Sequence, residues 1–388
     1  MTDKNAAFRF RVSTNLRFGA GESGQLGPEM KDLGFSRAAA VVDAAVASHA
    51  VVRAALQSVR DSGIGLDVYE TSEAEPTYEY LEAFRSRFAG KSYDSLVAVG
   101  GGSAMDLAKG IAVLLVNEGP ALSFRGFPKL KNRPLPLVAI PTTAGTGSEV
   151  TYNAVFTDGA QKKKLGINSM LNFPVCAILD PLLTVGCPKP VTVSSGADAL
   201  VHTLESFVHR NHTPLSRMHS IEAFKLVFPN LGKVLDQPQD LGVRGGLALG
   251  AYHAALALFN SGSGPSGALS YPLGAVYKVP HGYAGAVFLS SITRLNVEKG
   301  YEDFVLLYDQ MEGADKSLPV REKNRHFSHA IQGLMDKLGV PKSLSHYGLG
   351  PKDIDFMIGQ YEPLKAAIAQ NPMEMTQSDI ETIIRSLS

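Results

Sequence analysis

The sequence predicts an α/β domain with a parallel sheet, followed by an all-helical domain. Between about Arg37 and Asp180, short β-rich apolar runs alternate with helical patterns, and this alternation is typical of βαβ units. From Pro188 onward the strand patterns stop, and amphipathic or buried helices follow one another. A chain of 388 residues is also long enough for two cores of ordinary size.

Five strands are predicted in the first domain, each an apolar run bounded by turn residues. In chain order they are AAAVVD near Val41, GLDVYE near Val68, SLVAVG near Val97, PLVAI near Val138 and CAILD near Ile178. Because a helical pattern separates one run from the next, we expect the strands to pair in parallel.

The second domain is predicted to consist of helices, because apolar positions recur at helical spacing. Its clearest examples are Ile221 to Leu231, Leu241 to Leu258 and Val320 to Leu338. The segment DPLLTVGCPKP, residues 180–190, has closely spaced prolines and a glycine where the period of the pattern changes. We therefore predict an α/β domain of residues 1–185 and a helical domain of residues 186–388.

Composition excludes several classes of partner. Charged residues make up 19% of the chain and the formal net charge is zero, unlike the basic surfaces that bind nucleic acids or membranes. The beginning of the chain, MTDKNAAFRF, lacks the plan of a signal peptide, and no apolar run reaches the roughly 18 residues of a membrane span. We expect a cytoplasmic protein with a small-molecule ligand, in which Cys176 and Cys187 are core or loop thiols.

A Gly-rich segment, GGGSAMDLAKG from Gly100 to Gly110, follows a predicted strand and opens a helix. Glycines at such a turn let the backbone approach a phosphate, and the helix N-terminus offers unpaired N–H groups. A dinucleotide pyrophosphate would fit there, so the first domain is predicted to bind a nucleotide. Ser103 and Asp106 also have the spacing of a capping box, which leaves a well-capped helix after a tight turn as the alternative.

A second loop of small residues, PTTAGTGSEVT from Pro141 to Thr151, follows another predicted strand. Its hydroxyl groups can donate hydrogen bonds, and its glycines allow the backbone to approach a ligand. Asp43 ends an earlier strand, where its carboxylate can accept hydrogen bonds from a ribose diol and repel a 2′-phosphate. This favours NAD over NADP, although an aspartate at a strand end can equally be a turn residue.

The helical domain contains a candidate metal site. Asp198 and His202 are four residues apart, so both side chains project from one helix face, with Glu205 on roughly the same side. His281, on a turn framed by proline and glycine, can close the site from another element. Such groups can share a divalent cation, but a surface ion pair and a solvated loop histidine are simpler alternatives. Further histidines of this domain, which can line a ligand cleft but are expected on helix or loop surfaces, are His209, His212 and His253.

Together these segments resemble the iron-containing, or group III, alcohol dehydrogenases, which share their architecture with dehydroquinate synthase and glycerol dehydrogenase. The matching segments extend over nearly the whole chain. They are GGGSAMDLAK, PTTAGTGSEVT, KKKLGI from Lys162, DPLLT from Asp180, SSGADALVHTLESFV and NSGSGPSGALSYPLGAVYKVPHG. The resemblance implies a nucleotide-binding α/β domain, a helical domain, an active site in the cleft between them, and a homodimer.

The resemblance also implies roles for individual residues. Three residues match three of the four positions that hold the metal in the family, namely Asp198, His202 and His281. The implied cofactor contacts are Asp43, Gly101, Gly102, Ser103, Asp106, Thr142, Thr143, Thr146 and Lys164. The implied cofactors are NAD or NADP, with NAD favoured, and a divalent metal, iron or zinc.

The chain departs from the family where relatives read N-x-G-x-G-x-x-H-A-x-x-H-P-L-G. The matching residues 260–264 and 272–274 fix the register, which puts Gly267 at a metal-ligand position and Tyr271 at the position of a catalytic histidine. Glycine has no side-chain ligand, and an unperturbed tyrosine with a pKa of about 10 is a poorer proton shuttle than imidazole at about 6.5. We expect Gly267 to open space and Tyr271 to fill part of it. The usual Asn-Pro of relatives reads Glu75-Pro76, which alters one polar contact near the cofactor.

The predicted function is an NAD(P)-dependent alcohol dehydrogenase or aldehyde reductase that acts on a small carbonyl or alcohol. Asp198, His202 and His281 can still hold a catalytic metal, since catalytic zinc commonly uses three protein ligands and an open position. An alternative reductase lacks the metal and polarises the substrate oxygen with Tyr271, His281 or Ser266. Tyr271 is then the general acid, provided that its environment lowers its pKa. A non-redox enzyme on the same scaffold and an inactive nucleotide-binding homologue are the remaining alternatives.

Overall fold

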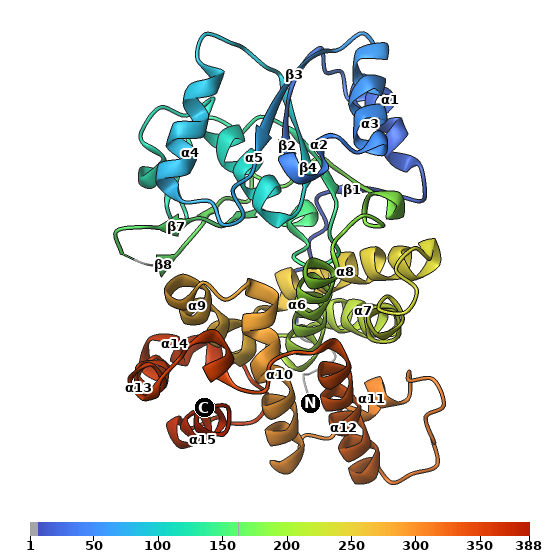
Figure 1. Cartoon of the computed structure of the whole chain (residues 1–388), viewed down its shortest axis with the longest axis vertical. Coiled ribbons are helices and arrows are strands. Elements are labelled where there is room, and N and C mark those ends of the chain that lie inside the picture. The colour runs from blue at the N-terminus through green and yellow to red at the C-terminus, as the bar shows by residue number, and fades with distance from the viewer. Residues whose placement is uncertain (1–6, 162) are drawn as a thin grey trace. The chain divides into compact units, whose positions relative to one another are not determined.

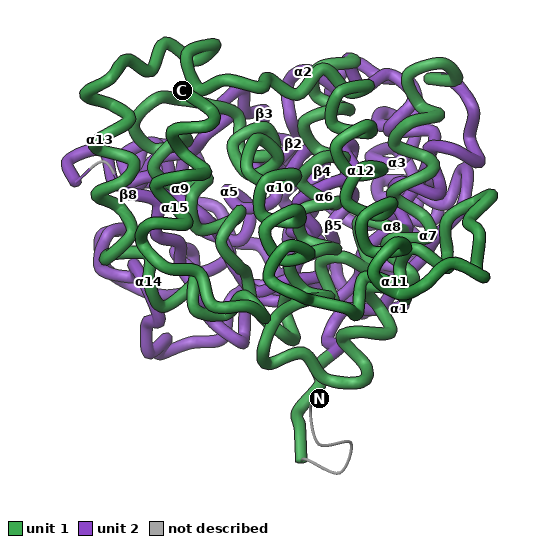
Figure 2. The backbone as a smooth tube through the Cα atoms, turned by 90° about the horizontal axis from the view of Figure 1, so that it is seen from below, with its two compact units in different colours: residues 1–11, 189–238, 250–388 green, residues 12–188, 239–249 purple. Residues whose placement is uncertain are grey.

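The chain forms two compact units, which Figure 2 shows in different colours. The computed structural model describes residues 7–161 and 163–388. One unit, the sheet unit, contains residues 12–188 and 239–249. The other, the helical unit, contains residues 189–238 and 250–388 together with the described part of residues 1–11. The first segment of the sheet unit ends at residue 188, and the predicted boundary was residue 185. Two short segments belong to the unit that was not predicted for them: residues 7–11 to the helical unit and residues 239–249 to the sheet unit.

The sheet unit is built on a parallel sheet that is six-stranded within the described residues. Its strands are β1 (Asn15–Phe18), β2 (Arg37–Asp43), β3 (Gly65–Thr71), β4 (Ser95–Gly100), β5 (Leu137–Pro141) and β10 (Cys176–Leu179). They lie in the order β1-β10-β5-β4-β2-β3, and each pairs in parallel with its neighbours. The five predicted strands and their parallel pairing are confirmed, and β1 was missed.

Helices cover both faces of this sheet (Figure 1). Successive side chains of a strand point to opposite faces, so a strand between two helical layers is apolar throughout. The even-numbered residues of β2 from 38 to 42 pack in one core with α1 (Leu26–Asp32) and α3 (Ala50–Asp61). Its residues 39 and 41 pack in a second core with α4 (Tyr78–Arg85) and α5 (Gly102–Leu114). The sheet thereby holds α5 against the end of β4.

Shorter elements complete the sheet unit. Its short helices are η1 (Glu22–Gln25), α2 (Ala44–Ala47), η2 (Ser86–Phe88), η3 (Ala121–Phe124), η4 (Ser148–Val150) and η5 (Pro181–Leu183). Two antiparallel pairs of two-residue strands follow η4, namely β6 (Asn153–Ala154) with β9 (Ile167–Asn168) and β7 (Thr157–Asp158) with β8 (Lys163–Lys164). Lys162, the first residue of the matched segment KKKLGI, lies outside the described residues.

The regular elements in the described part of the helical unit are all helices, as predicted. They are α6 (Lys189–Val208), α7 (Pro214–Lys233), α9 (Pro265–Tyr277), α10 (His281–Glu298), α11 (Val305–Tyr308), α12 (Val320–Leu338), η6 (Leu344–Tyr347), α13 (Pro351–Gly359), α14 (Tyr361–Ile368) and α15 (Gln377–Ser386). Local signals set several ends. Thr213 forms a capping box at the start of α7, and Gly339, with φ 70°, ends α12 in the left-handed conformation.

Helix α8 (Leu241–Ser261) begins in the sheet unit and continues in the helical unit. With 21 residues and a mean hydropathy of 1.2 over its most apolar window, it is long and apolar enough to cross a membrane, contrary to the expectation from sequence. Of that window, 67% is buried within the protein. A buried core helix meets the same criteria of length and composition, so this is weak evidence for a membrane span.

Candidate functional site

The Gly-rich turn joins β4 to α5 in the sheet unit. Gly100 has φ 153°, and a Cβ built there would lie 2.7 Å from Ala104 Cβ and 2.8 Å from Asp43 Cβ, so only glycine fits. No side chain among the described residues caps α5 at Gly101, and Ser103 Oγ donates to the carbonyl of Ala74 instead. The capping-box interpretation was therefore wrong, because the Ser103 hydroxyl is used elsewhere. A helix N-terminus without a side-chain cap of this kind suits an anion.

The Thr-rich loop, residues 142–147, lies directly against this turn. The amide of Thr142 donates to the carbonyl of Gly100 over 3.0 Å. A Cβ built on Gly102 would lie 2.8 Å from Thr146 Oγ1, and one built on Gly101 would lie 3.5 Å from the Thr143 hydroxyl. The structure therefore brings together the glycines and threonines that the sequence predicted as cofactor contacts. Hydroxyl and amide donors that converge in this way suit an anionic group.

Asp106 and Lys109 join α5 to the segment after the loop. Asp106 Oδ1 accepts from Ser148 Oγ over 2.6 Å, and its Oδ2 accepts from the amide of Val155 over 3.1 Å. Lys109 is fully buried, and its Nζ donates to Ser148 Oγ and to the carbonyl of Asn153, both over 2.8 Å. Asp106 was predicted to contact the cofactor, yet both of its oxygens bind the protein. Lys109 was missed, and its signal was a lysine on the apolar face of a strongly hydrophobic helix.

Burial shifts the proton affinities of this network. Desolvation lowers the pKa of Lys109 to about 8, although the charges of Asp106 and Glu149 oppose the shift. Desolvation also raises the pKa of Asp106 and raises that of Glu149 to about 7. Ionisable groups are therefore buried inside the sheet unit, where each charged form loses the solvation that it has in water.

Two further predicted cofactor contacts, Asp43 and Lys164, have partners within the protein. Asp43 Oδ1 accepts from the amide of Ala45 over 2.9 Å and so caps the short helix α2. The turn role is therefore real, and a ribose diol can still bind the other carboxylate oxygen. Lys164 Nζ lies 3.0 Å from Glu75 Oε2, and only 9% of the lysine side chain is exposed. The altered Glu75-Pro76 dipeptide thus supplies an ion-pair partner for a residue that was expected to face the cofactor.

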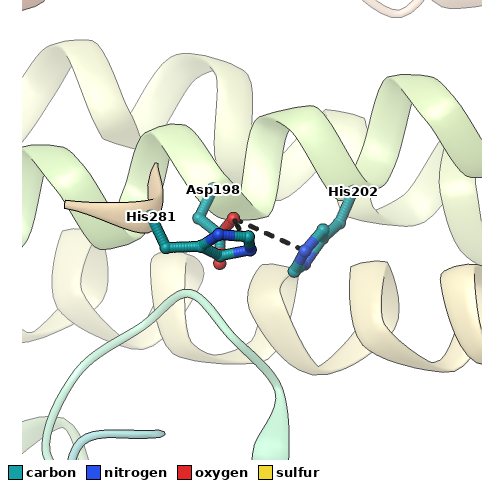
Figure 3. A group of neighbouring side chains, drawn as sticks. All are labelled: Asp198, His202 and His281. Carbon is teal, nitrogen blue, oxygen red and sulfur yellow. Dashed lines mark ion pairs between the residues drawn. The ribbon is translucent and has the colours of Figure 1, made fainter. Parts of the chain in front are cut away.

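The helical unit gathers Asp198, His202 and His281, as Figure 3 shows. Asp198 and His202 lie one turn apart on α6, and His281 is the first residue of α10 rather than a loop residue. Asp198 Oδ1 is 3.5 Å from His202 Nε2 and 3.8 Å from His281 Nε2. All three potential ligand atoms lie within 4.8 Å of one another. The predicted triad is therefore brought together.

These three residues fit a divalent metal. Bonds of about 2.0–2.2 Å at tetrahedral angles separate ligand atoms by roughly 3.4 Å, close to the observed spacing. No described residue makes a hydrogen bond with Asp198 Oδ2 or His202 Nδ1, although both atoms are buried. Buried polar atoms without partners are costly, and a bound cation would satisfy the carboxylate. Ser270 Oγ lies 3.4 Å from His281 Nδ1 and donates to the carbonyl of Gly267 over 2.7 Å, which orients the imidazole.

Glu205 has a different role from the triad. Its carboxylate accepts from the amides of Gly264 and Gly267 over 2.8 and 3.0 Å and from Ser263 Oγ over 3.0 Å. Since no side chain of residue 264 can cap α9, Glu205 caps this helix from outside. A Cβ built on Gly267 would overlap Ser263 Oγ and lie 2.9 Å from Glu205 Oε2. The expectation that Gly267 opens space was wrong, because the Ser263 hydroxyl and Glu205 fill it.

Tyr271 lies beside the triad, with its ring 6.0 Å from that of His281. Desolvation, and then the negative charges of Asp198 and Glu205, raise the pKa of Tyr271 above its ordinary value, although 42% of the residue is exposed. The two carboxylates are the firmer cause, since an exposed ring keeps part of its hydration. The metal-free mechanism required a lowered pKa at Tyr271, and the structure gives the opposite shift.

Other predictions about this unit are corrected. His209 is buried, and its ring occupies the space that a side chain on residue 262 would need. Desolvation lowers the pKa of His209 to about 4. His253 Nδ1 lies 2.8 Å from His219 Nδ1, so it belongs to a half-buried pair rather than to a helix surface. In the sheet unit, Cys176 is buried, and neither cysteine forms a disulfide within the described residues.

The fold and these sites define the class of protein. A parallel sheet with a Gly-rich turn at the end of a strand is typical of nucleotide-binding domains. A family model described as iron-containing alcohol dehydrogenase matches residues 13–181, and one described as Fe-containing alcohol dehydrogenase family, C-terminal, matches residues 192–388. The chain therefore belongs to the iron-containing alcohol dehydrogenase family and is an oxidoreductase, as its resemblance implied.

Relatives of known activity match over almost the whole chain. The 1,3-propanediol dehydrogenase of Citrobacter freundii is 33% identical over 385 residues, which cover 97% of this chain and 98% of that protein. The NAD-dependent methanol dehydrogenase of Bacillus methanolicus is 29% identical, with coverage of 95% and 96%. Among solved structures, 1,3-propanediol oxidoreductase has a TM-score of 0.92 at 29% identity and covers 99% of this chain and 100% of its own. Sulfoacetaldehyde reductase from Bifidobacterium kashiwanohense, solved in complex with NAD+, has a TM-score of 0.87 at 26% identity, with 99% of each chain covered.

Proposed function

We propose that this chain is an NAD-dependent alcohol dehydrogenase or aldehyde reductase that holds a divalent metal, iron or zinc, on Asp198, His202 and His281. The observation that carries the proposal is the convergence of these three side chains from two helices, with no described residue hydrogen-bonded to the buried Asp198 Oδ2. Two histidines and a carboxylate are a ligand set that suits zinc or ferrous iron with an open position.

Asp43 favours NAD over NADP as the cofactor. Its carboxylate ends β2 beside Gly100, where a negative charge accepts hydrogen bonds from a ribose diol and repels a 2′-phosphate. The turn and the Thr-rich loop supply the donors for the pyrophosphate. The NAD dependence in the name of the methanol dehydrogenase and the NAD+ in the sulfoacetaldehyde reductase structure support the same choice.

The proposed metal would act as a Lewis acid toward the substrate oxygen. The residues around it have separate tasks. Asp198 supplies the negative charge that favours a cation, and Ser270 orients the imidazole of His281. Tyr271 lies next to His281 and narrows the space beside it, so it acts on the substrate by shape and hydrogen bonding. A phenol with its ordinary pKa of about 10 is protonated near neutrality.

A small aldehyde or alcohol is the proposed substrate, in line with relatives named for propanediol, methanol and lactaldehyde. We further propose a homodimer in the cytoplasm, with the domain division near residue 185. Native mass spectrometry of the purified protein tests the dimer and, in the same sample, retained metal and nucleotide.

Metal content after substitution tests the proposed site. We expect about one iron or zinc per chain in the parent and a large loss in Asp198→Asn, because a neutral amide is a much weaker ligand. Asp309→Asn is the matched control, since Asp309 is an ion-paired carboxylate elsewhere in the helical unit, 2.9 Å from Lys323. Unchanged metal in Asp198→Asn, measured by element analysis, would overturn the assignment.

A metal-independent reductase is the second candidate, because the position of the missing fourth ligand is filled rather than vacant. The chelator-treated protein separates the two. Loss of NADH oxidation with an aldehyde, restored by zinc or ferrous iron, supports the metal site, whereas full activity without metal supports the alternative. Consumption of substrate with no net change in NADH would indicate a non-redox enzyme, and nucleotide binding with no turnover an inactive homologue.

A further inference from the structure

The buried lysine of α5 binds the segment that follows the Thr-rich loop. Lys109 donates to Ser148 Oγ and to the carbonyl of Asn153, and Ser148 in turn donates to Asp106. Asp106 also accepts from the amide of Val155. Four hydrogen bonds of 2.6–3.1 Å thus connect two residues of one helix with residues 148–155. The two α5 residues are three positions apart, so their side chains lie on one face of the helix.

This network holds the loop at its far end. At its near end the loop is held by the amide of Thr142, which donates to the carbonyl of Gly100. Between the two ends, Thr143 faces Gly101 and Thr146 faces Gly102. The distance between the loop hydroxyls and the amides of the turn therefore depends on both attachments.

An apolar contact would join helix and loop at a lower cost. Lys109 has no exposed surface, and transfer of charged groups out of water is expensive even when they are paired. Apolar side chains of similar volume often stabilise a fold as well as a buried ion pair does. Hydrogen bonds are directional, so they fix the position of the loop more tightly than apolar packing does. An anion binds well only when its hydrogen-bond donors are held at the right positions.

We propose that Lys109 is a positioning residue for the dinucleotide, which acts through Ser148 and Asp106 to hold the Thr-rich loop at the spacing from the Gly-rich turn that a pyrophosphate requires. This inference rests on the proposed function, since it presupposes that the sheet unit binds NADH. Lys109 itself touches neither phosphate nor substrate in this proposal. Its effect is on the geometry of the loop donors.

The test compares NADH binding in Lys109→Met and in the parent enzyme. Methionine keeps an unbranched chain and removes the charge and both hydrogen bonds. We expect the Kd for NADH, from fluorescence titration, to rise by about tenfold, which corresponds to the loss of roughly 1.4 kcal/mol. Most of the kinetic loss should fall on the KM for NADH rather than on kcat. Ser148→Ala should shift the Kd in the same direction, because it removes the bridging hydroxyl. In this variant the charges of Lys109 and Asp106 still have each other as partners.

Lys323→Met is the matched control. Lys323 is also buried, with 7% of its surface exposed, and it donates to Asp309 over 2.9 Å within the helical unit. Its loss should lower Tm as the loss of Lys109 does, without change in the Kd for NADH. The double variant Lys109→Met with Ser148→Ala should weaken binding by less than the product of the single effects, because both belong to one network.

The outcomes separate this inference from the proposed function. A parent protein that binds neither NADH nor NADPH would overturn both. A parent that binds NADH, with Lys109→Met and Ser148→Ala bound as tightly and only Tm lowered, would overturn the positioning role alone. If Lys109→Met fails to fold, Ser148→Ala decides the question, and an unchanged Kd in that variant would overturn the proposal.

Discussion

Gly102 lies where the Gly-rich turn meets the Thr-rich loop. A methyl group added at this residue tests whether NADH binding depends on the close approach of the turn and the loop. A Cβ at this position would lie 2.8 Å from Thr146 Oγ1 and 2.9 Å from its Cγ2. Gly102→Ala should therefore push the loop away and raise the Kd for NADH by about tenfold or more. Fluorescence titration measures this. Gly24→Ala is the control, since a Cβ on Gly24 meets nothing within 4 Å, and equal weakening by both variants would contradict the prediction.

Glu75 tests a different effect, the charge beside Lys164. The two side chains form an ion pair of 3.0 Å, in which Glu75 is one-third exposed. Glu75→Gln removes the competing carboxylate, so Lys164 becomes available to an anionic cofactor. A partly exposed pair is worth about 0.2–1 kcal/mol, so NADH should bind up to about fivefold more tightly. The gain should shrink at high salt.

The neighbouring Glu73→Gln is the control for this effect, because Glu73 is an exposed carboxylate of the same segment. Titration of the three proteins at two salt concentrations separates a local ion pair from general charge. Weaker NADH binding in Glu75→Gln would show that Glu75 helps to orient Lys164 rather than competing for it.

At the scale of elements, helix α9 depends on Glu205. The carboxylate caps the helix through the amides of Gly264 and Gly267 and leaves no room for a side chain at residue 267. Gly267→His, which restores the residue of relatives, should force Ser263 from Glu205 and cost about 1–3 kcal/mol of unfolding free energy. Thermal unfolding measures the loss of stability, and element analysis should find no gain in metal content.

Removal of the obstructing hydroxyl is the informative comparison. The double variant Ser263→Ala with Gly267→His should recover part of the lost stability, because it relieves the overlap with Ser263 Oγ. Gly267→His alone could instead be as stable as the parent and bind metal more tightly. That result would contradict the prediction, because it would show that Ser263 and Glu205 move aside readily and that the structure does not require glycine at residue 267.

Periodicity predicted the elements well where burial is regular. The strand β2 is apolar on both faces because helices cover both, and α12 begins and ends at Val320 and Leu338 as its amphipathic pattern indicated. The edge strand β1 was missed, because four residues that include a polar first position and an arginine give too weak an alternation. A short strand of this kind is set by its neighbour in space rather than by its own sequence.

Side-chain partners were predicted less well than elements. The spacing of Asp198 and His202 on one helix was sufficient to predict that they meet. His281 was proposed from its Pro/Gly-framed position as a group that can close the site, and the family resemblance assigned it to the same metal. The partners of Ser103 and Asp106 within the protein were not predicted, because these partners, Ala74 and Ser148, are distant in sequence. Pattern and spacing describe one element at a time, and these bonds join elements.

At the scale of the whole molecule, the two units should respond to mild acid in opposite directions. Four histidines of the helical unit have a lowered pKa, chiefly through desolvation, and those of His209 and His253 fall to about 4. Between their ordinary value near 6.5 and about 4, the unfolded chain binds protons that the folded unit does not. The helical unit therefore loses unfolding free energy as pH falls through this range.

The sheet unit contains the reverse case. Desolvation raises the pKa of Glu149 to about 7 and also raises that of Asp106, so the folded unit takes up protons before the unfolded chain does. This contribution to stability grows as pH falls from about 7 toward the ordinary value near 4.5. The pKa of Lys109, about 8, lies above the range and adds no change within it.

Hydrogen exchange with mass spectrometry, compared at pH 7 and pH 5 after correction for intrinsic exchange rates, measures both units in one experiment. Peptides of α7 and of residues 250–261 in α8 should lose protection at the lower pH while those of β2, β4 and α5 keep theirs. His253→Asn should reduce the loss, because one imidazole of the half-buried pair with His219, near Glu222 and Lys225, can no longer take up a proton. His329→Asn, at an exposed position on α12, should not. Equal loss of protection in both units would mean that they unfold as one body and that the titration of the buried histidines does not act on the helical unit separately.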